Sequence, residues 1–400
     1  MKIVHVSTYP KGGAANAATR LHEGLLSLGV ESKVLCRNQT ADDINENYAV
    51  NPSIWFRRIS TLIKNLKILP NVYIKDDNCE NFSFPISSYR LEDDPFVQEA
   101  DVVVLHWVGD FLDYGSFFKN FKKPVYWFLH DMNPFMGGFH YFEDSQIYRK
   151  YASLEKKFLK IKSDAYKLKD NISVIAPSKW LMNASKESDL LGRFKHFHLQ
   201  YGINPSQLPL IDRSEAREHF KLPKDKKTLL FVSEKVSNRR KGAQLLIDAL
   251  KKVDFKEDVS ILIVGNYDKN IFQSKNIYPV GVLKTPQEMA LAYSAADLFV
   301  LSSREDNLPN VMLESMFCGT PVMSFAVGGM KDVINSKNGI LIDSINVDEL
   351  ATSLASWSSD TNEFNRENIR SYAIKQFDQI TQAKKFKQIL ENKAIEEKLF

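Results

Sequence analysis

The sequence predicts an α/β protein built from two doubly wound domains in series. Its 400 residues exceed what one hydrophobic core usually holds. Short runs rich in Val, Ile and aromatic residues alternate with amphipathic stretches, which is typical of parallel strands joined by right-handed helical crossovers. This alternation stops near residue 203 and then begins again, so two such domains are expected.

Nine short apolar runs are predicted to form the strands. Five lie in the first half of the chain, at residues 2–7, 31–36, 101–107, 123–130 and 172–178. Four lie in the second half, at residues 227–233, 260–265, 297–303 and 320–325. Each run has the length and the branched or aromatic composition of a buried strand.

The domain boundary is predicted within residues 199–212, which are rich in turn residues and show no periodicity. We expect an N-terminal Rossmann-like domain over residues 1–202 and a C-terminal one over residues 203–375. Residues 370–390 carry apolar side chains at helical spacing. A C-terminal helix over about residues 376–400 is therefore expected to pack back across both domains and to rest on the N-terminal one.

The composition is that of an ordinary globular protein, with 44% hydrophobic and 26% charged residues. A formal net charge of +4 is too small to indicate nucleic-acid binding. Cys36, Cys79 and Cys318 are too widely spaced for a disulfide framework or a metal site, which fits a reducing cytosol. With no secretory signal and no apolar run of ~18 residues, we expect a cytoplasmic protein whose membrane contact is peripheral.

Ligands are expected at the carboxyl ends of the strands, in a deep cleft between the two domains. The first motif at such a position is Lys11, Gly12 and Gly13, between a predicted strand and a predicted helix. Small residues and free amides at a helix start suit a phosphate or a polar sugar, although a tight turn explains the segment equally well. The fingerprint G-x-G-x-x-G is absent, which argues against a nicotinamide dehydrogenase.

The second motif is WFLHDMNPFMGGFHYFEDS, where His130 and Asp131 follow a predicted strand. His130 could donate a hydrogen bond to a substrate hydroxyl, with Asp131 orienting it or binding an acceptor. A lone histidine is more often structural. The nearby Gly137 and Gly138, together with His140, favour the functional interpretation here.

The third motif is the basic cluster Arg239, Arg240 and Lys241, between a predicted strand and a predicted helix. Guanidinium and ammonium groups at that position match a diphosphate and would neutralise it as a leaving group. A solvated basic turn is the common alternative.

The fourth motif, SSREDNLPNVMLESMFCG, contains the acids Glu305, Asp306 and Glu314. Glu314 lies on a short predicted helix that ends near Gly319. A carboxylate there can accept the two adjacent hydroxyls of a ribose, while loop amides and a second acid hold a sugar ring. An exposed acidic cap is an equally good explanation of the residues alone.

Three segments together resemble glycosyltransferase family 4: KGG after the first strand, RKG in the second domain, and SREDNLPNVMLESMFCGTPVMSFAVGG near its end. The segment HDMNPFMGGFHY is similar to that of bacterial members that build surface polysaccharides. The resemblance implies the GT-B fold and retaining transfer from a UDP- or GDP-linked sugar, bound mainly by the second domain. It also implies a glycan or polyprenyl-linked acceptor on the first domain, no cofactor and no metal.

The hallmark of this family is an acid, seven intervening residues and a glutamate, which contact the donor sugar and the ribose. Asp306 lies eight positions before Glu314, whereas Glu305 lies nine before it. The resemblance therefore implies Asp306 as the sugar ligand in place of the usual glutamate, with Glu305 as the fallback. Asn307 and Leu308 of the same loop are expected to be further donor contacts.

The same matching implies that Lys241 binds the diphosphate. The arginine usually found five residues earlier is replaced by Val236, so Arg240 or Arg239 is expected to substitute for it. The remaining implied roles are the phosphates or acceptor for Gly12 and Gly13, the nucleobase for Val282 and Leu283, the reacting sugar for His130, and the acceptor side for Asp131 and His140.

Residues 54–75 carry five basic side chains and no acid among aromatic and aliphatic residues. Such a segment can lie on an anionic lipid surface, which suits a polyprenyl-linked acceptor, but a helix docked on its own sheet explains it equally well. The competing functions are a GT-B-fold sugar-nucleotide epimerase and a non-catalytic binder of sugar nucleotides or glycans. A solute-binding protein is disfavoured by the missing export signal.

Overall fold

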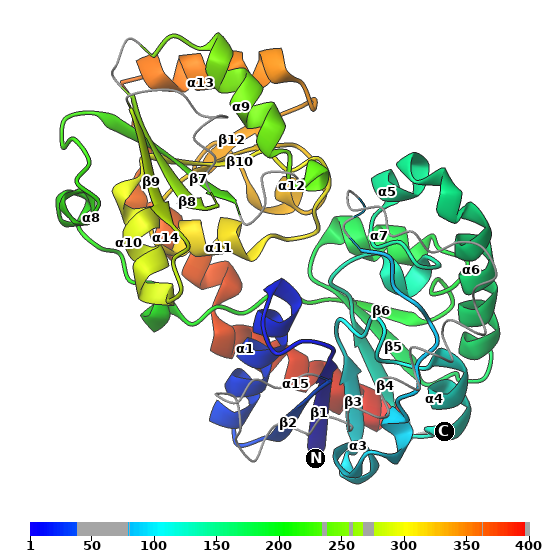
Figure 1. Cartoon of the computed structure of the whole chain (residues 1–400). Helices are drawn as coiled ribbons and strands as arrows, with labels where there is room; N and C mark the ends of the chain where they lie inside the picture. The colour runs from blue at the N-terminus through cyan, green and yellow to red at the C-terminus, as the bar shows by residue number, and fades with distance from the viewer. Residues whose placement is uncertain are drawn as a thin grey trace. The chain divides into compact units, whose positions relative to one another are not determined.

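The computed structural model describes residues 1–37, 79, 81–233, 238–255, 259–266, 276–361 and 363–396. The chain divides into two compact units, unit 1 (Met1–Gly202 with Gln379–Phe400) and unit 2 (Ile203–Asp378), each with a six-stranded sheet (Figure 1). The predicted membrane-contact segment 54–75 and Val236 lie outside the described residues.

The sheet of unit 1 has the strand order β2-β1-β3-β4-β5-β6, and all neighbouring strands run parallel. Its strands are β1 Lys2–Ser7, β2 Glu31–Cys36, β3 Val102–Leu105, β4 Val125–Phe128, β5 Ile172–Ala176 and β6 Lys195–His198. Its α-helices are α1 Gly13–Ser27, α3 Pro95–Glu99, α4 Tyr114–Asn120, α5 Phe142–Ile147, α6 Ala152–Tyr166, α7 Lys179–Lys186 and α15 Gln379–Glu396. Single 3-10 turns are η2 Leu91–Asp93, η3 Asn133–Phe135 and η4 Arg149–Tyr151.

Helices cover both faces of this sheet, as β4 demonstrates. The indole of Trp127 packs against Tyr114 of α4 and Tyr166 of α6. The preceding side chain, Tyr126, points to the opposite face and contacts Phe386 of α15, which lies beside α1 in Figure 1. Because successive strand residues alternate between faces, burial on both sides explains the uninterrupted apolar runs of the sequence.

The sheet of unit 2 has the order β12-β11-β10-β7-β8-β9 and is also parallel. Its strands are β7 Lys227–Ser233, β8 Val259–Gly265, β9 Ile277–Gly281, β10 Leu298–Leu301, β11 Val322–Phe325 and β12 Gly339–Ile342. Its helices are α8 Arg213–His219, α9 Ala243–Lys252, α10 Pro286–Ala295, α11 Asn310–Phe317, α12 Met330–Val333, α13 Val347–Ser359 and α14 Arg366–Phe377, with 3-10 turns η5 Pro205–Gln207 and η6 Arg239–Lys241. Leu246 of α9 and Leu354 of α13 share one core with the strands, whereas Tyr293 of α10 packs on Phe299 of β10.

All nine predicted strands are present, and the prediction missed β6, β9 and β12. All three are edge strands of their sheets. An edge strand has one strand neighbour and keeps partly exposed side chains, as in the run KHFH of β6. Such a run lacks the continuous apolar signal of a central strand.

The C-terminal stretch 370–390, with apolar residues at helical spacing, is interrupted in the structure. Helix α14 ends at Phe377, Asp378 has an extended backbone, and α15 begins at Gln379. In unit 2, α14 packs on α11, and in unit 1, α15 packs on α1. The apolar spacing continues across the break, which is why the pattern alone does not reveal it.

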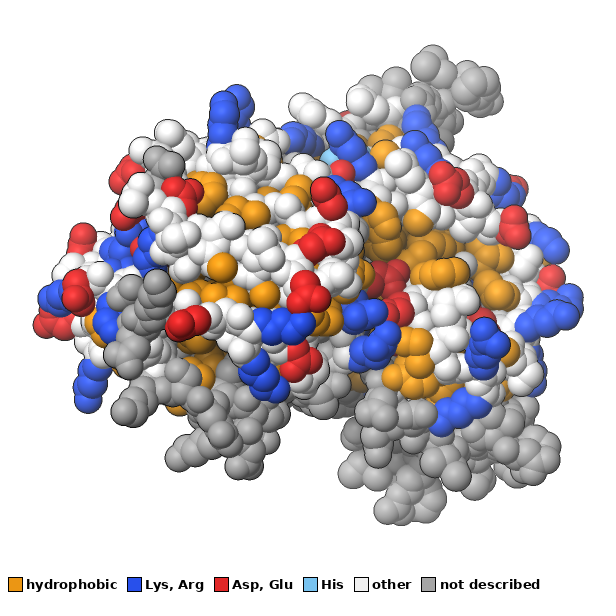
Figure 2. All heavy atoms as spheres, turned by 90° about the horizontal axis from the view of Figure 1, so that it is seen from above, with side chains coloured by type: hydrophobic (Ala, Val, Ile, Leu, Met, Phe, Trp, Pro, Cys, Tyr) orange, Lys and Arg blue, Asp and Glu red, His pale blue; other side chains and the backbone are white. Residues whose placement is uncertain are grey.

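The distribution of surface charges and the state of the cysteines are those of an ordinary globular protein. Figure 2 shows Lys and Arg side chains interspersed with Asp and Glu, so the coloured part of that face has no large patch of one sign. The three cysteines are buried thiols. Among the described residues, no helix combines the length and the apolar composition needed to cross a bilayer.

Candidate active site

Two loops of unit 2 meet beyond the carboxyl ends of β7 and β10. The turn η6 is capped by the side chain of Asn238. The amide of Arg304 donates to the carbonyl oxygen of Arg240 over 2.7 Å, and the Arg240 guanidinium donates to the carbonyl oxygen of Glu305 over 3.0 Å. The basic turn and the acidic loop are thereby held together, although they lie about 65 residues apart in sequence.

Asp306 and Lys241 form the central ion pair of this region. The Lys241 Nζ lies 2.6 Å from Oδ2 of Asp306, and Arg240 Nη1 lies 3.5 Å from the same oxygen. The Asp306 side chain is 8% exposed, whereas that of Lys241 is 41% exposed. Burial raises the pKa of Asp306, but Lys241 and then Arg240 outweigh it, so its pKa lies below the usual value and the carboxylate is ionised.

The structure distinguishes Asp306 from Glu305. Asp306 directs its carboxylate at the basic turn, and its Oδ1 also accepts from the amide of Asn307 over 3.0 Å. Glu305 is half-buried and meets the basic turn through its main-chain carbonyl. Of the two acids, Asp306 therefore has its carboxylate beside the two cations.

Gly328 fixes the backbone of this acidic loop. It has a left-handed φ of 52°, and a Cβ at this position would overlap the carbonyl oxygen of Asp306. The amide of Gly329 donates to the carbonyl oxygen of Asn307 over 2.7 Å. The missing side chain of Gly328 thus allows the close approach that holds the main chain of Asp306 in place.

The other residues predicted to bind the donor are spread over the same unit. Glu314 is half-buried on α11, and its Oε2 lies 3.4 Å from the Tyr293 hydroxyl. Asn307 and Leu308 are buried in the acidic loop. After β9, Val282 is 62% exposed and Leu283 is half-buried. Their contacts with a donor stay predictions.

In unit 1, Gly12 and Gly13 lie at the carboxyl end of β1, where α1 begins. Gly12 precedes the helix with a φ of 108°, and a Cβ there would meet no atom within 4 Å. Both glycines are exposed. The backbone at this helix start is therefore accessible from the side on which Gly12 lacks a side chain.

His130, two residues after β4, uses both ring nitrogens within unit 1. Its Nδ1 lies 2.8 Å from the Tyr201 hydroxyl, and its Nε2 lies 2.9 Å from Nδ1 of His106. Burial lowers its pKa to about 4, against the opposing effect of Asp131, so the ring is neutral at pH 7. The hydrogen bond that the sequence predicted from His130 to a substrate hydroxyl would have to replace one of these two.

The acceptor-side candidates Asp131 and His140 bind each other. Nδ1 of His140 lies 2.6 Å from Oδ2 of Asp131, which also accepts from Nε1 of Trp107 over 2.9 Å. The remaining oxygen of Asp131 accepts from the amide of Asn133, and Nε2 of His140 lies 2.8 Å from the Ser83 hydroxyl. Both side chains are buried, so they brace the loop, and contact with an acceptor stays a prediction.

The glycine pair in this loop has a structural cause. The Glu155 carboxylate accepts from the amides of Gly137 and Gly138, at 2.6 Å each, and from that of Phe139 at 3.2 Å. The buried ammonium of Lys162 donates to the carbonyl oxygen of Met136 over 2.8 Å. Gly137 makes room for Glu155 and Gly138 makes room for the ring of Phe82, so packing explains this glycine pair, and its functional interpretation stays a prediction.

Gly137→Ala is expected to destabilise unit 1 by about 1–3 kcal/mol, because the new Cβ would overlap the Glu155 carbonyl oxygen. Urea unfolding of the full chain measures the change. The matched control is Gly115→Ala in the first turn of α4, where the nearest atom to a Cβ is 3.8 Å away. Equal stability of both variants would contradict the close packing.

Sequence reasoning missed several residues that complete these arrangements, namely His5, Trp107, His106, Glu155, Lys162 and Tyr201. A signal existed for two of them, because His5 and His106 are polar side chains within otherwise apolar strand runs. The other residues gave no comparable signal, since their partners are distant in sequence.

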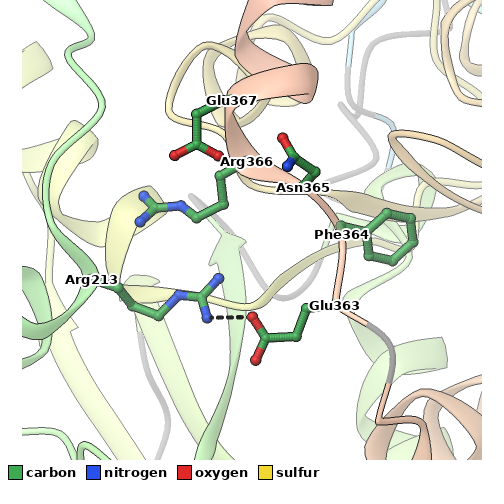
Figure 3. A pocket seen from close by; sticks show the side chains of 6 residues that line it. All are labelled: Arg213, Glu363, Phe364, Asn365, Arg366 and Glu367. Carbon is green, nitrogen blue, oxygen red and sulfur yellow. Dashed lines mark hydrogen bonds and ion pairs between the residues drawn. The ribbon is translucent and has the colours of Figure 1, made fainter.

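A separate surface pocket of unit 2 lies at the start of α14 and contains none of the predicted site residues. Its lining is Arg213, Glu363, Phe364, Asn365, Arg366 and Glu367 (Figure 3). Arg213 pairs with Glu363 at 3.3 Å and with Asp297 at 2.8 Å. Arg366 donates to the carbonyl oxygens of Ile211 and Cys318. These contacts tie α14 to neighbouring segments.

Unit 2 is similar in sequence to a known protein family. Residues 226–360 match the family model described as Glycosyl transferases group 1. The matched residues all lie within unit 2. A relative, an uncharacterized glycosyltransferase of Methanocaldococcus jannaschii, is 28% identical over 163 residues, covering 38% of this chain and 41% of that protein. The chain thus spans about two fifths of that curated relative.

Solved structures share the fold over nearly the whole chain. Sucrose-phosphate synthase from Thermosynechococcus elongatus has a TM-score of 0.69 at 17% identity, with 98% of each chain covered. Anabaena HepE in complex with UDP-glucose has a TM-score of 0.64 at 17% identity, covering 98% of this chain and 100% of that one. The predicted α/β class and GT-B fold, with two Rossmann-like domains, are confirmed.

Proposed function

We propose that this chain is a retaining glycosyltransferase that moves a sugar from a nucleotide-diphosphate sugar to a hydroxyl of a glycan or lipid-linked acceptor. The observation that carries the proposal is the ion pair of Lys241 with Asp306, beside Arg240, in the segment that matches the group 1 family model. Two cations and one buried carboxylate leave a net positive charge, which suits a diphosphate. The UDP-glucose bound to HepE supports a UDP-linked donor.

Donor binding would exchange the partners of this ion pair. The diphosphate competes with Asp306 for the ammonium of Lys241, which has the more exposed side chain. The ionised Asp306 carboxylate, which accepts hydrogen bonds only, then receives hydroxyls of the sugar. By the resemblance, Glu314 would take the ribose, and Val282 with Leu283 would pack on the nucleobase.

The proposed reaction needs no protein nucleophile. The acceptor oxygen bonds to the anomeric carbon on the face from which the diphosphate leaves, the bond to the phosphate oxygen breaks, and the acceptor proton passes to that oxygen. Configuration is retained. Lys241 and Arg240 stabilise the charge that develops on the leaving phosphate, so we propose that no metal ion is required. Surface-polysaccharide synthesis in the cytoplasm is the role that the resemblance supports.

A donor screen tests the proposal. We expect the melting temperature to rise with a UDP- or GDP-linked sugar, because a ligand that binds the folded state stabilises it. A CMP-linked sugar, which has one phosphate, serves as the control. The matching donor should release nucleoside diphosphate when an acceptor is present. Sugar isomerisation without release would identify an epimerase, and binding without turnover a non-catalytic binder.

A further inference from the structure

Three histidines of unit 1 form a hydrogen-bonded chain that ends at Tyr201. Nδ1 of His5 lies 2.9 Å from Nε2 of His106, and Nδ1 of His106 lies 2.9 Å from Nε2 of His130. Nδ1 of His130 lies 2.8 Å from the Tyr201 hydroxyl. Each link between histidines therefore joins an Nδ1 to an Nε2.

The sheet register places these rings on one face. His5 on β1 pairs with Val104 on β3, and His106 lies two residues beyond Val104. Leu105 pairs with Trp127 on β4, so His106 is level with the next residue, and His130 lies two beyond that. Each step moves one strand across and two residues along, which keeps the side chains on the same face.

The chain ends in the interior at His5, which is fully buried. Its Nε2 has no hydrogen-bond partner among the described residues. Besides His106, the rings of His22 and Phe386 lie near it, with centroids 6.3 and 6.4 Å away. His22 has its own partner, because its Nδ1 lies 2.8 Å from the Ser32 hydroxyl.

Neutral imidazoles in such a chain cannot choose their tautomers independently. Each ring has one N–H donor and one acceptor nitrogen. Since every link joins Nδ1 to Nε2, the three rings carry their protons either all on Nδ1 or all on Nε2. The second arrangement leaves His5 with a buried N–H that lacks an acceptor, whereas the first leaves only an unused lone pair. Buried orphan N–H groups are the rarer defect in proteins, so the first is favoured.

We propose that His5, His106 and Tyr201 are positioning residues that hold His130 in a single neutral tautomer, with its proton on Nδ1 and donated to Tyr201. This inference rests on the proposed function, in which His130 lies near the reacting sugar. An anomeric carbon that loses a diphosphate gains positive charge, and a neutral ring of fixed orientation does not repel that charge. His130 then transfers no proton to the substrate.

The test is long-range ¹H–¹⁵N NMR of the ¹⁵N-labelled full chain at pH 7. We expect His5, His106 and His130 each to be neutral with Nδ1 protonated. In Tyr201→Phe the proton on His130 loses its acceptor, so the two arrangements become closer in energy. The spectrum of His5, three links away, should then shift toward the Nε2–H tautomer. Tyr166→Phe, on the opposite face of the sheet, should leave His5 unchanged.

Activity provides the second measurement. Tyr201→Phe should lower kcat about tenfold with a smaller change in the donor KM, the size of effect that one hydrogen bond produces. Mixed tautomers among the three histidines of the parent protein, or an unchanged His5 spectrum in Tyr201→Phe, would overturn the proposal. A parent protein that transfers no sugar would contradict the proposed function alone, because the NMR spectra do not depend on turnover.

Discussion

Lys241→Met is expected to lower kcat for sugar transfer by about 10²–10³-fold, the effect of removing one group that stabilises a developing negative charge. In the proposed reaction, the Lys241 ammonium leaves Asp306 for the diphosphate and binds it most strongly as the sugar departs. The fold should persist, because Asp306 retains Arg240 and the amide of Asn307. Steady-state kinetics and a thermal melt measure the two effects separately.

The matched control is Lys251→Met. Lys251 lies on α9 of the same unit, is 63% exposed and pairs only at the surface with Asp248. The Lys251→Met variant should leave kcat unchanged. Parental turnover in Lys241→Met would remove Lys241 from the diphosphate, and an equal loss in both variants would indicate an unspecific effect of charge.

Unit 1 is expected to lose stability as the pH falls from about 6.5 to 4. Seven of the eight histidines of the chain lie in this unit. Burial lowers the pKa of His5 to about 3 and those of His22 and His130 to about 4. Burial, with His130 and His5 as neighbours, holds the pKa of His106 well below its usual value.

The direction of this change in stability with pH follows from proton binding. In the unfolded chain these imidazoles are protonated below about pH 6.5, whereas in the folded unit they stay neutral down to their lowered pKa values. The unfolded state thus binds more protons, and the stability present above pH 6.5 is lost as the pH falls. His5 alone contributes on the order of 4 kcal/mol near its folded pKa. Asp131, whose pKa is lowered from 3.8, acts only at more acidic pH.

Urea unfolding at a series of pH values between 7 and about 4 measures this loss. His22→Asn should flatten the pH dependence, because one neutral buried imidazole is removed. His219→Gln, at an exposed position of unit 2, is the control and should not change it. A free energy of unfolding that stays constant over this range would contradict the neutral histidine cluster.

The strands were predictable from the sequence where the sheet is covered on both faces. Central strands such as β3 and β10 are covered on both faces, and their apolar runs indicated them directly. The edge strands β6 and β9 were missed because their side chains are partly exposed, whereas β12 was missed although its run GILI is apolar. The break at Asp378 was missed because the apolar spacing continues on both sides of it.

The resemblance to glycosyltransferase family 4 selected Asp306, because its hallmark fixes the spacing between the first acid and Glu314. The structure places the Asp306 carboxylate beside Lys241 and Arg240, and its contact with a donor sugar stays a prediction. The environment of His130 was not predictable, because His106 and Tyr201 reach it through the sheet register and a later segment of the chain.

The most direct test of the proposed function is an NMR time course of the matching nucleotide sugar with protein and acceptor. We predict that the ³¹P signals of the donor are replaced by those of free nucleoside diphosphate, while the ¹H anomeric signal of the product shows the configuration of the donor. The Lys241→Met variant should show neither change at the parental rate. An inverted product, or a donor that is epimerised without release of diphosphate, would contradict the account.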